Sequence, residues 1–394
     1  MDKNRHNTGS LAIDATSFLP RMTEHRRHLH AHPEIGLDLP DTHEYIKTAL
    51  ENLGLDPEVH PSAGVTVRIN GSSKSDQIRI LRADMDALPL IERTGLSFGS
   101  KNVGAMHACG HDMHMAMLLA AAEMFVTQRP EFDVILAFQP GEESDRGALA
   151  VLQHKNLQLQ GNVLAFAIHV NSIIESGRIA YRKGTFMANG DWFRVTFRGP
   201  GGHASAPKLT VSPIEATAAF VIGLAEISKT LNLEEPLVAT VTEILSGNTV
   251  NVIPTSGSLR GTLRSISVEH RIRLHRALAK LAKQTAMEIG VACDVEITDG
   301  YPAVVNDSRF ISALDTALND EALSARISIM EAPSMVIEDF SYFLEKWPGA
   351  MVYLGAKATA NPSFNHSDDV IFDETAMVTG LMLHSIVANL AVGI

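Results

Sequence analysis

The pattern of apolar and polar residues divides the chain into two regions with different orders of predicted strands and helices. In the first, apolar runs alternate with longer helical stretches. The runs have the length of buried strands and lie at 65–69, 77–84, 133–139, 163–170 and 350–355. Helices are predicted at 18–54, interrupted by Pro33 and Pro40, and at 112–126, 146–154, 307–318, 338–346 and 374–391. Buried strands that alternate with helices predict an α/β domain with a mostly parallel sheet covered on both faces.

The pattern changes near Gly190. From about 191 to 298, the segments follow the order strand, helix, strand, strand, helix, strand. This is the order of a split βαβ, or ferredoxin-like, unit. We therefore predict a small domain at 190–299, inserted into a larger domain formed by 1–189 and 300–394.

Composition narrows the class of protein. The 394 residues exceed the size at which one hydrophobic core stops growing, about 250–300 residues. With 45% hydrophobic and 20% charged residues, the chain is neither disordered nor fibrous. The formal charge of -12, with no basic block to offset it, argues against a nucleic-acid partner.

The cysteine content and the two ends of the chain bear on its compartment. Cys109 and Cys293 cannot build a disulfide framework, and the first residues lack the apolar stretch of a secretion signal. We therefore expect a cytoplasmic protein. The last twenty residues carry no formal charge and are long enough to span a bilayer, but His384 and Asn389 interrupt them. A buried terminal helix is favoured, with no membrane partner.

Residues of the kinds that bind metals or move protons lie where predicted strands end. They are Cys109 and His111 in MHACGHDMH, Glu142 and Glu143 in FQPGEES, His169 at the end of 163–170, and His366 before the last helix. Each group alone has an ordinary alternative, such as a buried Cys, a solvated acidic turn or a core histidine. Because loops at strand ends build the sites of open α/β sheets, the groups together predict a mixed donor set for ions such as Zn²⁺ or Mn²⁺, adequate for two of them.

Eight segments spread over nearly the whole chain carry a more specific signal. They are RRHLHAHPEIGLDLPDT (26–42), RADMDALPL (82–90), MHACGHDMH (106–114), FQPGEES (138–144), GPGGHASAP (199–207), NVIP (251–254), EDFSYF (338–343) and YLGA (353–356). In this order they resemble the amidohydrolase branch of the aminoacylase and carboxypeptidase metallopeptidase family. That branch includes hippurate hydrolases, N-acyl-amino-acid amidohydrolases and hydrolases of indole-acetyl amino acids. The inserted small domain resembles the dimerisation or lid domain of that family.

The resemblance implies roles for particular residues. Two divalent ions would be held by Cys109, His111, Glu143, His169 and His366, with the Cys109 sulfur as the bridging ligand. Glu142 would be the general acid/base, because an unligated carboxylate must accept the proton of the attacking water and return it to the leaving amine. The family pattern leaves His107 and His114 as supporting residues.

Further residues are expected around this site. Asp86 resembles a residue that does not bind the metal itself but orients the imidazole of a ligand histidine. In the alternative interpretation, its side chain only hydrogen-bonds the backbone of a turn at the strand end. His203 resembles a histidine that reaches the active site of a partner subunit and hydrogen-bonds the developing oxyanion. Asn251 and Arg264 are candidates for binding the substrate carboxylate, because Arg supplies a planar fork and Asn a directed donor. For Arg264 the alternative is an ordinary surface arginine on a strand.

These residues predict a metal-dependent amidohydrolase acting on N-acyl amino acids of the hippurate, N-acetyl or indole-acetyl type. The expected cofactors are two divalent ions per subunit, Zn or Mn first and Co or Ni as alternatives. A homodimer or dimer-based oligomer is expected. The rival functions are a dipeptidase or carboxypeptidase of the same family, a metal-independent cysteine hydrolase that uses Cys109, and a binding protein without turnover. Retention of Glu142 beside all five expected ligands argues against the last.

The chain also departs from its relatives near the substrate. Where they commonly have Pro-His and then Asp-Pro after the GGH motif, this chain has Pro207-Lys208 and Ser212-Pro213. Where they commonly have a Pro shortly after the last ligand, it has Ser367-Asp368. None of these positions is an expected ligand, so the departures bear on the substrate rather than on hydrolysis.

Overall fold

The computed structural model describes residues 14–143, 146–231, 235–320 and 323–393. These residues form two compact units. One comprises the described residues up to Ala180, Ser312–Ser328 and those from Val352 onward, and the other comprises Tyr181–Ile311 and Ile329–Met351. Ser144, which ends one of the motifs, and the first thirteen residues, where no secretion signal is expected, lie outside the described residues.

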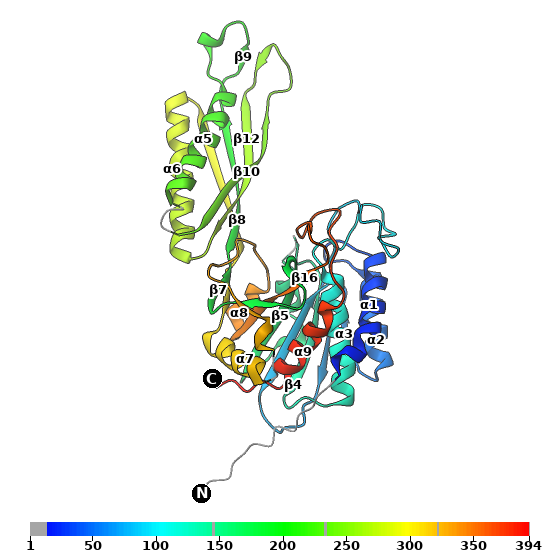
Figure 1. Cartoon of the computed structure of the whole chain (residues 1–394). Coiled ribbons are helices and arrows are strands. Elements are labelled where there is room, and N and C mark those ends of the chain that lie inside the picture. Colours follow the sequence, from blue (N-terminus) through cyan, green and yellow to red (C-terminus); the bar gives the residue numbers. More distant parts are fainter. Residues whose placement is uncertain (1–13, 144–145, 232–234, 321–322, 394) are drawn as a thin grey trace. The chain divides into compact units, whose positions relative to one another are not determined.

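The first unit is built on a sheet with a parallel centre (Figure 1). The strands follow the order β1 (Glu58–His60), β2 (Gly64–Ile69), β4 (Asp133–Gln139), β3 (Ile78–Asp84), β5 (Val163–Glu175), β16 (Gly349–Lys357), β6 (Ile179–Tyr181) and β15 (Ile327–Ile329). Strand β3 runs parallel to both β4 and β5. Antiparallel pairs join β1 to β2, β2 to β4 and β16 to β6. The predicted α/β class is therefore confirmed.

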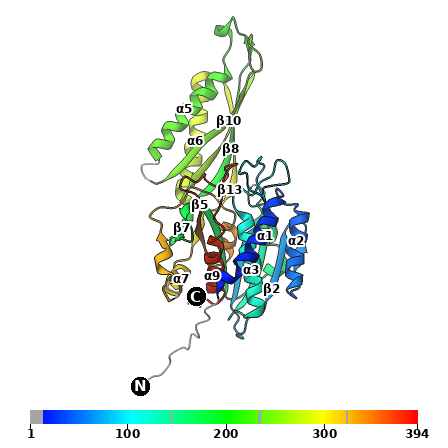
Figure 2. The ribbon, with the colours of Figure 1, turned by 45° about the vertical axis from the view of Figure 1, so that its right-hand side comes forward.

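Helices pack on this sheet as the apolar pattern indicates. Helix α3 (His111–Thr127) is apolar around most of its circumference and is accordingly almost wholly buried. It packs against β3, α1 (Leu19–Ala31) and α9 (Ala376–Ala388), and Figure 2 shows α1 and α3 side by side. Because α3 begins at His111, its N-terminus brings that residue to the edge of the sheet where β3 and β4 end.

Proline positions explain the start of the chain. Helix α1 ends at Ala31, two residues before Pro33, because a proline disfavours helical backbone at the residue that precedes it. Helix α2 (Pro40–Asn52) begins with Pro40, whose missing N–H costs nothing in the first turn. The long predicted helix is therefore two helices, broken where the prolines indicated.

The C-terminal segment folds as the buried helix that the sequence favoured. Helix α9 spans 13 residues, most of them buried. No helix within the described ranges combines the length and the apolarity that crossing a membrane would require.

The second unit contains the predicted split βαβ arrangement. Its elements follow the order β8 (Asn189–Arg198), α5 (Pro213–Leu231), β10 (Leu237–Ser246), β12 (Ser256–Ser265), α6 (Val268–Ile289) and β13 (Ala292–Tyr301). The strands form an antiparallel sheet in the order β10-β12-β8-β13. Alternate residues of β8, including Phe193 and Phe197, pack with Phe220 of α5 and Leu278 of α6 in one core. The domain boundaries predicted at 190 and 299 stay a prediction.

Several boundaries differ from the predicted ones. The helix predicted at 146–154 is the short α4 (Gly147–Val151), followed by a 3₁₀ turn at Lys155–Leu157. Strand β5 continues beyond Val170 to Glu175, and the Ser172 hydroxyl in this extension donates to the Ser363 carbonyl at 2.8 Å. The remaining elements are β7 (Gly184–Met187), β9 (Gly202–His203), β11 (Val252–Ile253), β14 (Val304–Asn306), α7 (Ser308–Asp320) and α8 (Ser341–Lys346).

Candidate metal centre

The parallel strands bring the predicted groups of the first unit to one edge of the sheet. Asp86 follows β3, and Glu142 and Glu143 follow β4. The pairing of β3 with β5 ends at Arg82↔Ala167, so His169 lies within β5, two residues beyond the last of these pairs. Because β3, β4 and β5 run in the same direction, these side chains meet outside the carboxyl ends of the strands.

Cys109 and His111 reach this edge through a tight turn at Gly110. Gly110 has φ of 92°, a left-handed conformation that favours glycine. A Cβ atom at this position would lie 2.2 Å from Cγ2 of Val170, so a larger residue has no room. The turn leaves Cys109 buried next to the N-terminus of α3, where the helix dipole favours a thiolate.

Five of the predicted residues form two groups that share Cys109. Cys109 Sγ lies 3.4 Å from Nε2 of His169 and 3.3 Å from Nε2 of His366. His366 Nε2 also lies 3.3 Å from Oε1 of Glu143. Within each of the groups Cys109/His111/His169 and Cys109/Glu143/His366, all donor atoms lie within 4.8 Å of one another. Such spacing allows each group to hold one cation, with the sulfur common to both.

Hydrogen bonds place the two buried imidazoles in the state that a metal ligand needs. Nδ1 of His111 lies 2.7 Å from the Asp86 carbonyl, and Nδ1 of His169 lies 2.8 Å from the Val170 carbonyl. A carbonyl only accepts, so in each ring Nδ1 carries a proton and Nε2 is the nitrogen left to face a cation. Burial, reinforced by the nearby His114, lowers the pKa of His169 to about 3, so this ring is neutral at pH 7.

The donor set fits a divalent cation. Nε2 of His111 is buried and has no hydrogen-bond partner in the described part of the chain. An unsatisfied buried polar atom is costly, and a cation would satisfy it. Burial, and after it the neighbouring Glu143 carboxylate, raise the pKa of Asp86 well above its usual range. Thiolate, imidazole and carboxylate together suit Zn²⁺ and similar ions.

Asp86 contacts the site through two different groups. Its carbonyl accepts the His111 proton, whereas its carboxylate accepts the backbone N–H of Glu142 at 2.9 Å and that of Glu143 at 3.0 Å. The carboxylate lies 3.7 Å from His111 Nδ1, beyond hydrogen-bond distance. The side chain thus holds the Glu142–Glu143 turn, while the main chain orients the imidazole.

Glu142 lies beside the two groups without belonging to either. It is buried, and its donor oxygen forms a third close group with His111 and Glu143. A buried carboxylate next to a cation site, and outside both ligand groups, is well placed to move a proton.

His114 and Asp84 were not among the predicted site residues. His114 Nδ1 donates to Asp84 at 2.5 Å, and its Nε2 accepts the N–H of Val170 at 2.8 Å. Both ring nitrogens are thus in use, which agrees with a supporting role. Burial opposes ionisation of Asp84, but His111, His114 and Arg82 outweigh it and hold its pKa well below the usual range. Asp84 and His114 both stand in motifs that the sequence analysis identified, but nothing in the sequence indicated that they hydrogen-bond to each other.

The loop that carries His366 is held by contacts that the sequence analysis missed. His366 has φ of 72°, and its N–H donates to the Ala108 carbonyl at 2.9 Å. Asn365 donates to the carbonyls of Cys109 and Val170, each at 3.1 Å. At Ser367-Asp368, where the chain differs from its relatives, Asp368 makes a bidentate ion pair with Arg93 at 2.7 and 2.8 Å.

His203, Asn251 and Arg264 belong to the second unit. Strands β9 and β11 pair His203 with Val252, and the Ala204 N–H donates to the Asn251 carbonyl at 3.0 Å. His203 and Asn251 are therefore neighbours, both exposed, at the short antiparallel pair that β9 and β11 form. Arg264 lies on β12 instead, where it donates to the Met335 carbonyl at 2.8 Å and lines a hollow of about 690 Å³ on the sheet.

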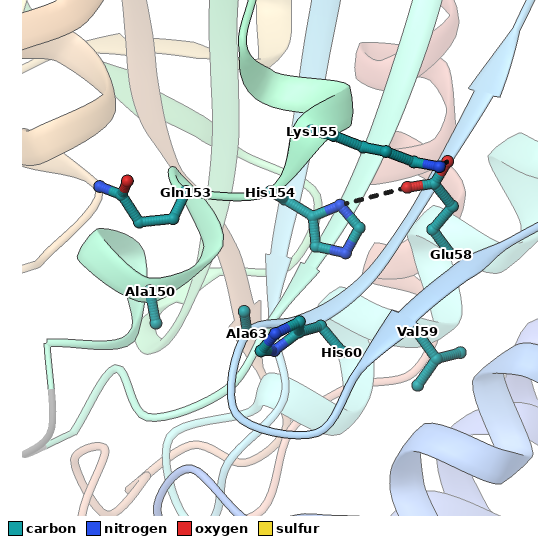
Figure 3. Close-up of a pocket in the computed structure, with 8 residues that line it drawn as sticks. All are labelled: Glu58, Val59, His60, Ala63, Ala150, Gln153, His154 and Lys155. Atoms are coloured by element: carbon teal, nitrogen blue, oxygen red, sulfur yellow. Dashed lines mark ion pairs between the residues drawn. The ribbon is translucent and has the colours of Figure 1, made fainter.

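A separate pocket of about 500 Å³ lies in the first unit (Figure 3). Its lining residues are Glu58, Val59, His60, Ala63, Ala150, Gln153, His154 and Lys155. Glu58 lies 2.8 Å from Nζ of Lys155 and 3.6 Å from Nδ1 of His154, the ion pair dashed in Figure 3. These charged groups already compensate one another, and the pocket contains none of the predicted site residues.

Comparison with known proteins identifies a family, two relatives and a solved structure that this chain resembles. The family described as peptidase family M20/M25/M40 matches residues 80–388. An N-acetyldiaminopimelate deacetylase from Oenococcus oeni is 34% identical over 368 residues, which cover 90% of this chain and 94% of the relative. Thermostable carboxypeptidase 1 from Saccharolobus solfataricus is 32% identical over 379 residues, covering 92% and 93%. A solved structure of a dinuclear metal binding peptidase from the M20 family, from Bacillus subtilis, has a TM-score of 0.79 and 28% identity, covering 94% of this chain and 98% of that one.

Proposed function

Because this chain belongs to peptidase family M20/M25/M40, we propose that it is a dimetal amidohydrolase that cleaves N-acyl amino acids into a carboxylic acid and a free amino acid. The family resemblance seen in the sequence motifs is confirmed. The acyl group is of the acetyl, benzoyl (as in hippurate) or indole-acetyl type. The observation that carries the proposal is the pair of donor groups that share Cys109.

The five residues of these two groups would hold the ions, and the Cys109 sulfur is common to both groups. Zn²⁺ or Mn²⁺ is proposed first, with Co²⁺ or Ni²⁺ as alternatives. When bound, the ions supply Lewis acidity and a water of lowered pKa. Glu142 accepts the proton of the attacking water and then donates it to the leaving nitrogen. Asp86 keeps Glu142 and Glu143 in place through its bonds to their backbone N–H groups.

The second unit is proposed to complete the site. His203 would donate to the developing oxyanion, in a partner subunit's site, within a homodimer. Asn251 and Arg264 would bind the substrate carboxylate. The exposure of His203 and Asn251 supports their roles, because both residues are accessible to a substrate or a second subunit. The two-cysteine composition supports a cytoplasmic location.

A carboxypeptidase is the second candidate function, because a relative with that name covers 92% of the chain. The two reactions share one half of the substrate: each cleaves an amide whose nitrogen belongs to an amino acid with a free carboxylate. They differ in the acyl side, which is a simple acid in one case and a peptide in the other. Residues that bind the shared carboxylate therefore do not distinguish the two functions. A panel of substrates that differ on the acyl side does.

The test is a mass-spectrometric screen of N-acetyl, N-benzoyl and indole-acetyl amino acids, dipeptides and longer peptides. Metal-depleted enzyme is refilled separately with Zn²⁺, Mn²⁺, Co²⁺ or Ni²⁺. We expect no turnover after depletion and cleavage of N-acyl amino acids after refilling. Preference for peptides would favour the carboxypeptidase. Full turnover by the depleted enzyme, lost in Cys109→Ala but kept in the matched Cys293→Ala variant, would establish a cysteine hydrolase instead.

A further inference from the structure

One amide side chain links the segments that carry three of the proposed ligands. Asn365 precedes His366 directly, and its Nδ2 donates to the carbonyl of Cys109 at 3.1 Å. The same Nδ2 donates to the carbonyl of Val170, also at 3.1 Å. Its Oδ1 accepts the N–H of Ser172 at 3.0 Å. The amide therefore uses both of its N–H groups and its carbonyl oxygen. Its three partners are backbone groups of Cys109, Val170 and Ser172.

Two of these contacts reach segments that carry proposed ligands, and a third proposed ligand adjoins Asn365. The Cys109 carbonyl belongs to the residue whose sulfur is common to both donor groups. The Val170 carbonyl also accepts the Nδ1 proton of His169 and so determines which nitrogen of that ring faces the sulfur. The third ligand, His366, is the next residue in the chain.

The backbone at His366 needs such support. Its φ of 72° is in the left-handed region, which is unfavourable for a residue with a Cβ. The N–H of His366 donates to Ala108, next to Cys109. The Asn365 bonds and the Ala108 bond together tie the loop to the Cys109 segment at two adjacent residues, which keeps His366 Nε2 at 3.3 Å from the sulfur.

We propose that Asn365 is a positioning residue that holds Cys109, His169 and His366 in the geometry required to bind two cations. The inference rests on the proposed metal centre. It adds that Asn365 controls how tightly this centre binds its cations. Asn365 makes no contact with the substrate in this proposal. It acts only through the three ligands.

The test compares Asn365→Asp with Asn102→Asp in the full chain. Aspartate has the size of asparagine but replaces the donating NH₂ with an oxygen, which repels both carbonyls. Asn102 is the matched control, because its Nδ2 donates to one carbonyl, that of Pro33, which belongs to no ligand. Asn365→Ala, which removes the donors without adding charge, is measured in parallel.

The probe is Co²⁺ added to metal-depleted protein, with the thiolate-to-cobalt absorption band as readout. We expect Asn365→Asp and Asn365→Ala to bind Co²⁺ roughly 10- to 100-fold more weakly than wild type, the usual scale for residues that orient ligands. The band should shift or weaken at saturation, while Asn102→Asp matches wild type. Circular dichroism of the metal-free proteins identifies the folded fraction to which each affinity refers.

A merely structural role would give another result. It would lower the melting temperature of the metal-free variants but leave the Co²⁺ affinity and the band of the folded protein unchanged, and this outcome overturns the proposal. If Asn365→Ala folds and Asn365→Asp does not, the Co²⁺ affinity of Asn365→Ala alone decides between the two roles by the same criterion. Failure of wild type itself to bind Co²⁺ would instead contradict the metal centre on which the proposal rests.

Discussion

Glu142 and Glu143 are adjacent in the chain but have different surroundings. Glu143 Oε1 lies 3.3 Å from His366 Nε2, inside one of the donor groups that contain Cys109. Glu142 lies outside both of those groups. The backbone N–H groups of both residues are held by Asp86, so a change in either side chain leaves the turn intact.

The two carboxylates should therefore respond differently to the same substitution. Glu142→Gln should keep both metal ions but lower turnover by roughly 10²-fold or more, the scale of general acid/base catalysis. Glu143→Gln should lose metal, because an amide is a poorer ligand than a carboxylate. Metal content by elemental analysis and turnover on one substrate test both. The reverse pattern would mean that the roles are exchanged.

His30 provides a prediction about stability that does not involve the ligands. Its Nδ1 lies 2.9 Å from Oδ2 of Asp112, and its Nε2 lies 3.3 Å from Glu92. Burial lowers the pKa of His30, but the bonds to the two carboxylates outweigh burial and raise it to about 9. The ring is therefore charged in the folded state at neutral pH.

A raised folded-state pKa means that protonation stabilises the folded protein. This contribution is complete below the unfolded pKa, about 6.5, and is lost as the pH rises through about 9. The unfolding free energy of wild type minus that of His30→Gln should fall between pH 6 and pH 9.5, by an amount on the order of 3 kcal/mol. Urea unfolding of the metal-free proteins measures the difference. A difference that stays constant or rises with pH would contradict the charged state of His30.

At the scale of an element, the turn before α3 determines whether Cys109 and His111 can face the same site. Gly110 and Gly104 have almost the same left-handed φ, 92° and 91°. A Cβ on Gly110 would lie 2.2 Å from Val170 Cγ2, whereas a Cβ on Gly104 has nothing within 4 Å. The two positions thus separate the cost of backbone conformation from the cost of a clash in the site.

Gly104→Ala should lower the unfolding free energy by about 1 kcal/mol, the cost of a Cβ in the left-handed region, and keep full metal content. Gly110→Ala should be less stable than Gly104→Ala and should bind metal more weakly, because either the turn or β5 must move. Thermal unfolding with and without metal measures both effects. Equal behaviour of the two variants would show that the close approach to Val170 does not matter.

At the scale of the whole molecule, the proposed catalytic groups are divided between the two units. His203 belongs to the second unit, and the five proposed ligands and Glu142 belong to the first. The family resemblance favours a site shared between two subunits. In a homodimer of this kind, each site would take His203 from one chain and Glu142 from the other.

Sharing predicts complementation between two inactive variants. His203→Ala should keep its metals and lose about 3 kcal/mol of transition-state stabilisation, the effect of removing an oxyanion donor. Mixed with Glu142→Gln, it should form dimers with one doubly defective site and one intact site, so up to about half the activity returns per mixed dimer. Turnover is followed after subunit exchange, with native mass spectrometry to show mixed dimers. Mixed dimers that stay inactive would place His203 in its own subunit's site.

The sequence by itself determined the element types, because periodicity and proline positions act locally. The apolar runs predicted β3, β4 and β5, and Pro33 and Pro40 predicted the break between α1 and α2. The order of segments predicted the split βαβ sheet of the second unit. Functional side chains were identifiable for a similar reason, since chemically distinctive residues stand in recognisable motifs at the ends of these elements.

Only the tertiary structure decided which atoms of those residues meet. The carboxylate of Asp86 bonds to backbone groups 56 and 57 positions away, and Cys109 Sγ meets His366 across 257 positions. Asn365 had no distinguishing pattern, because its role depends on two carbonyls brought to it by β5 and by the turn at Gly110. Hydrogen-bond partners so distant in the chain leave no periodic signal, since their spacing is determined by how the strands and helices pack and not by the pitch of any one of them.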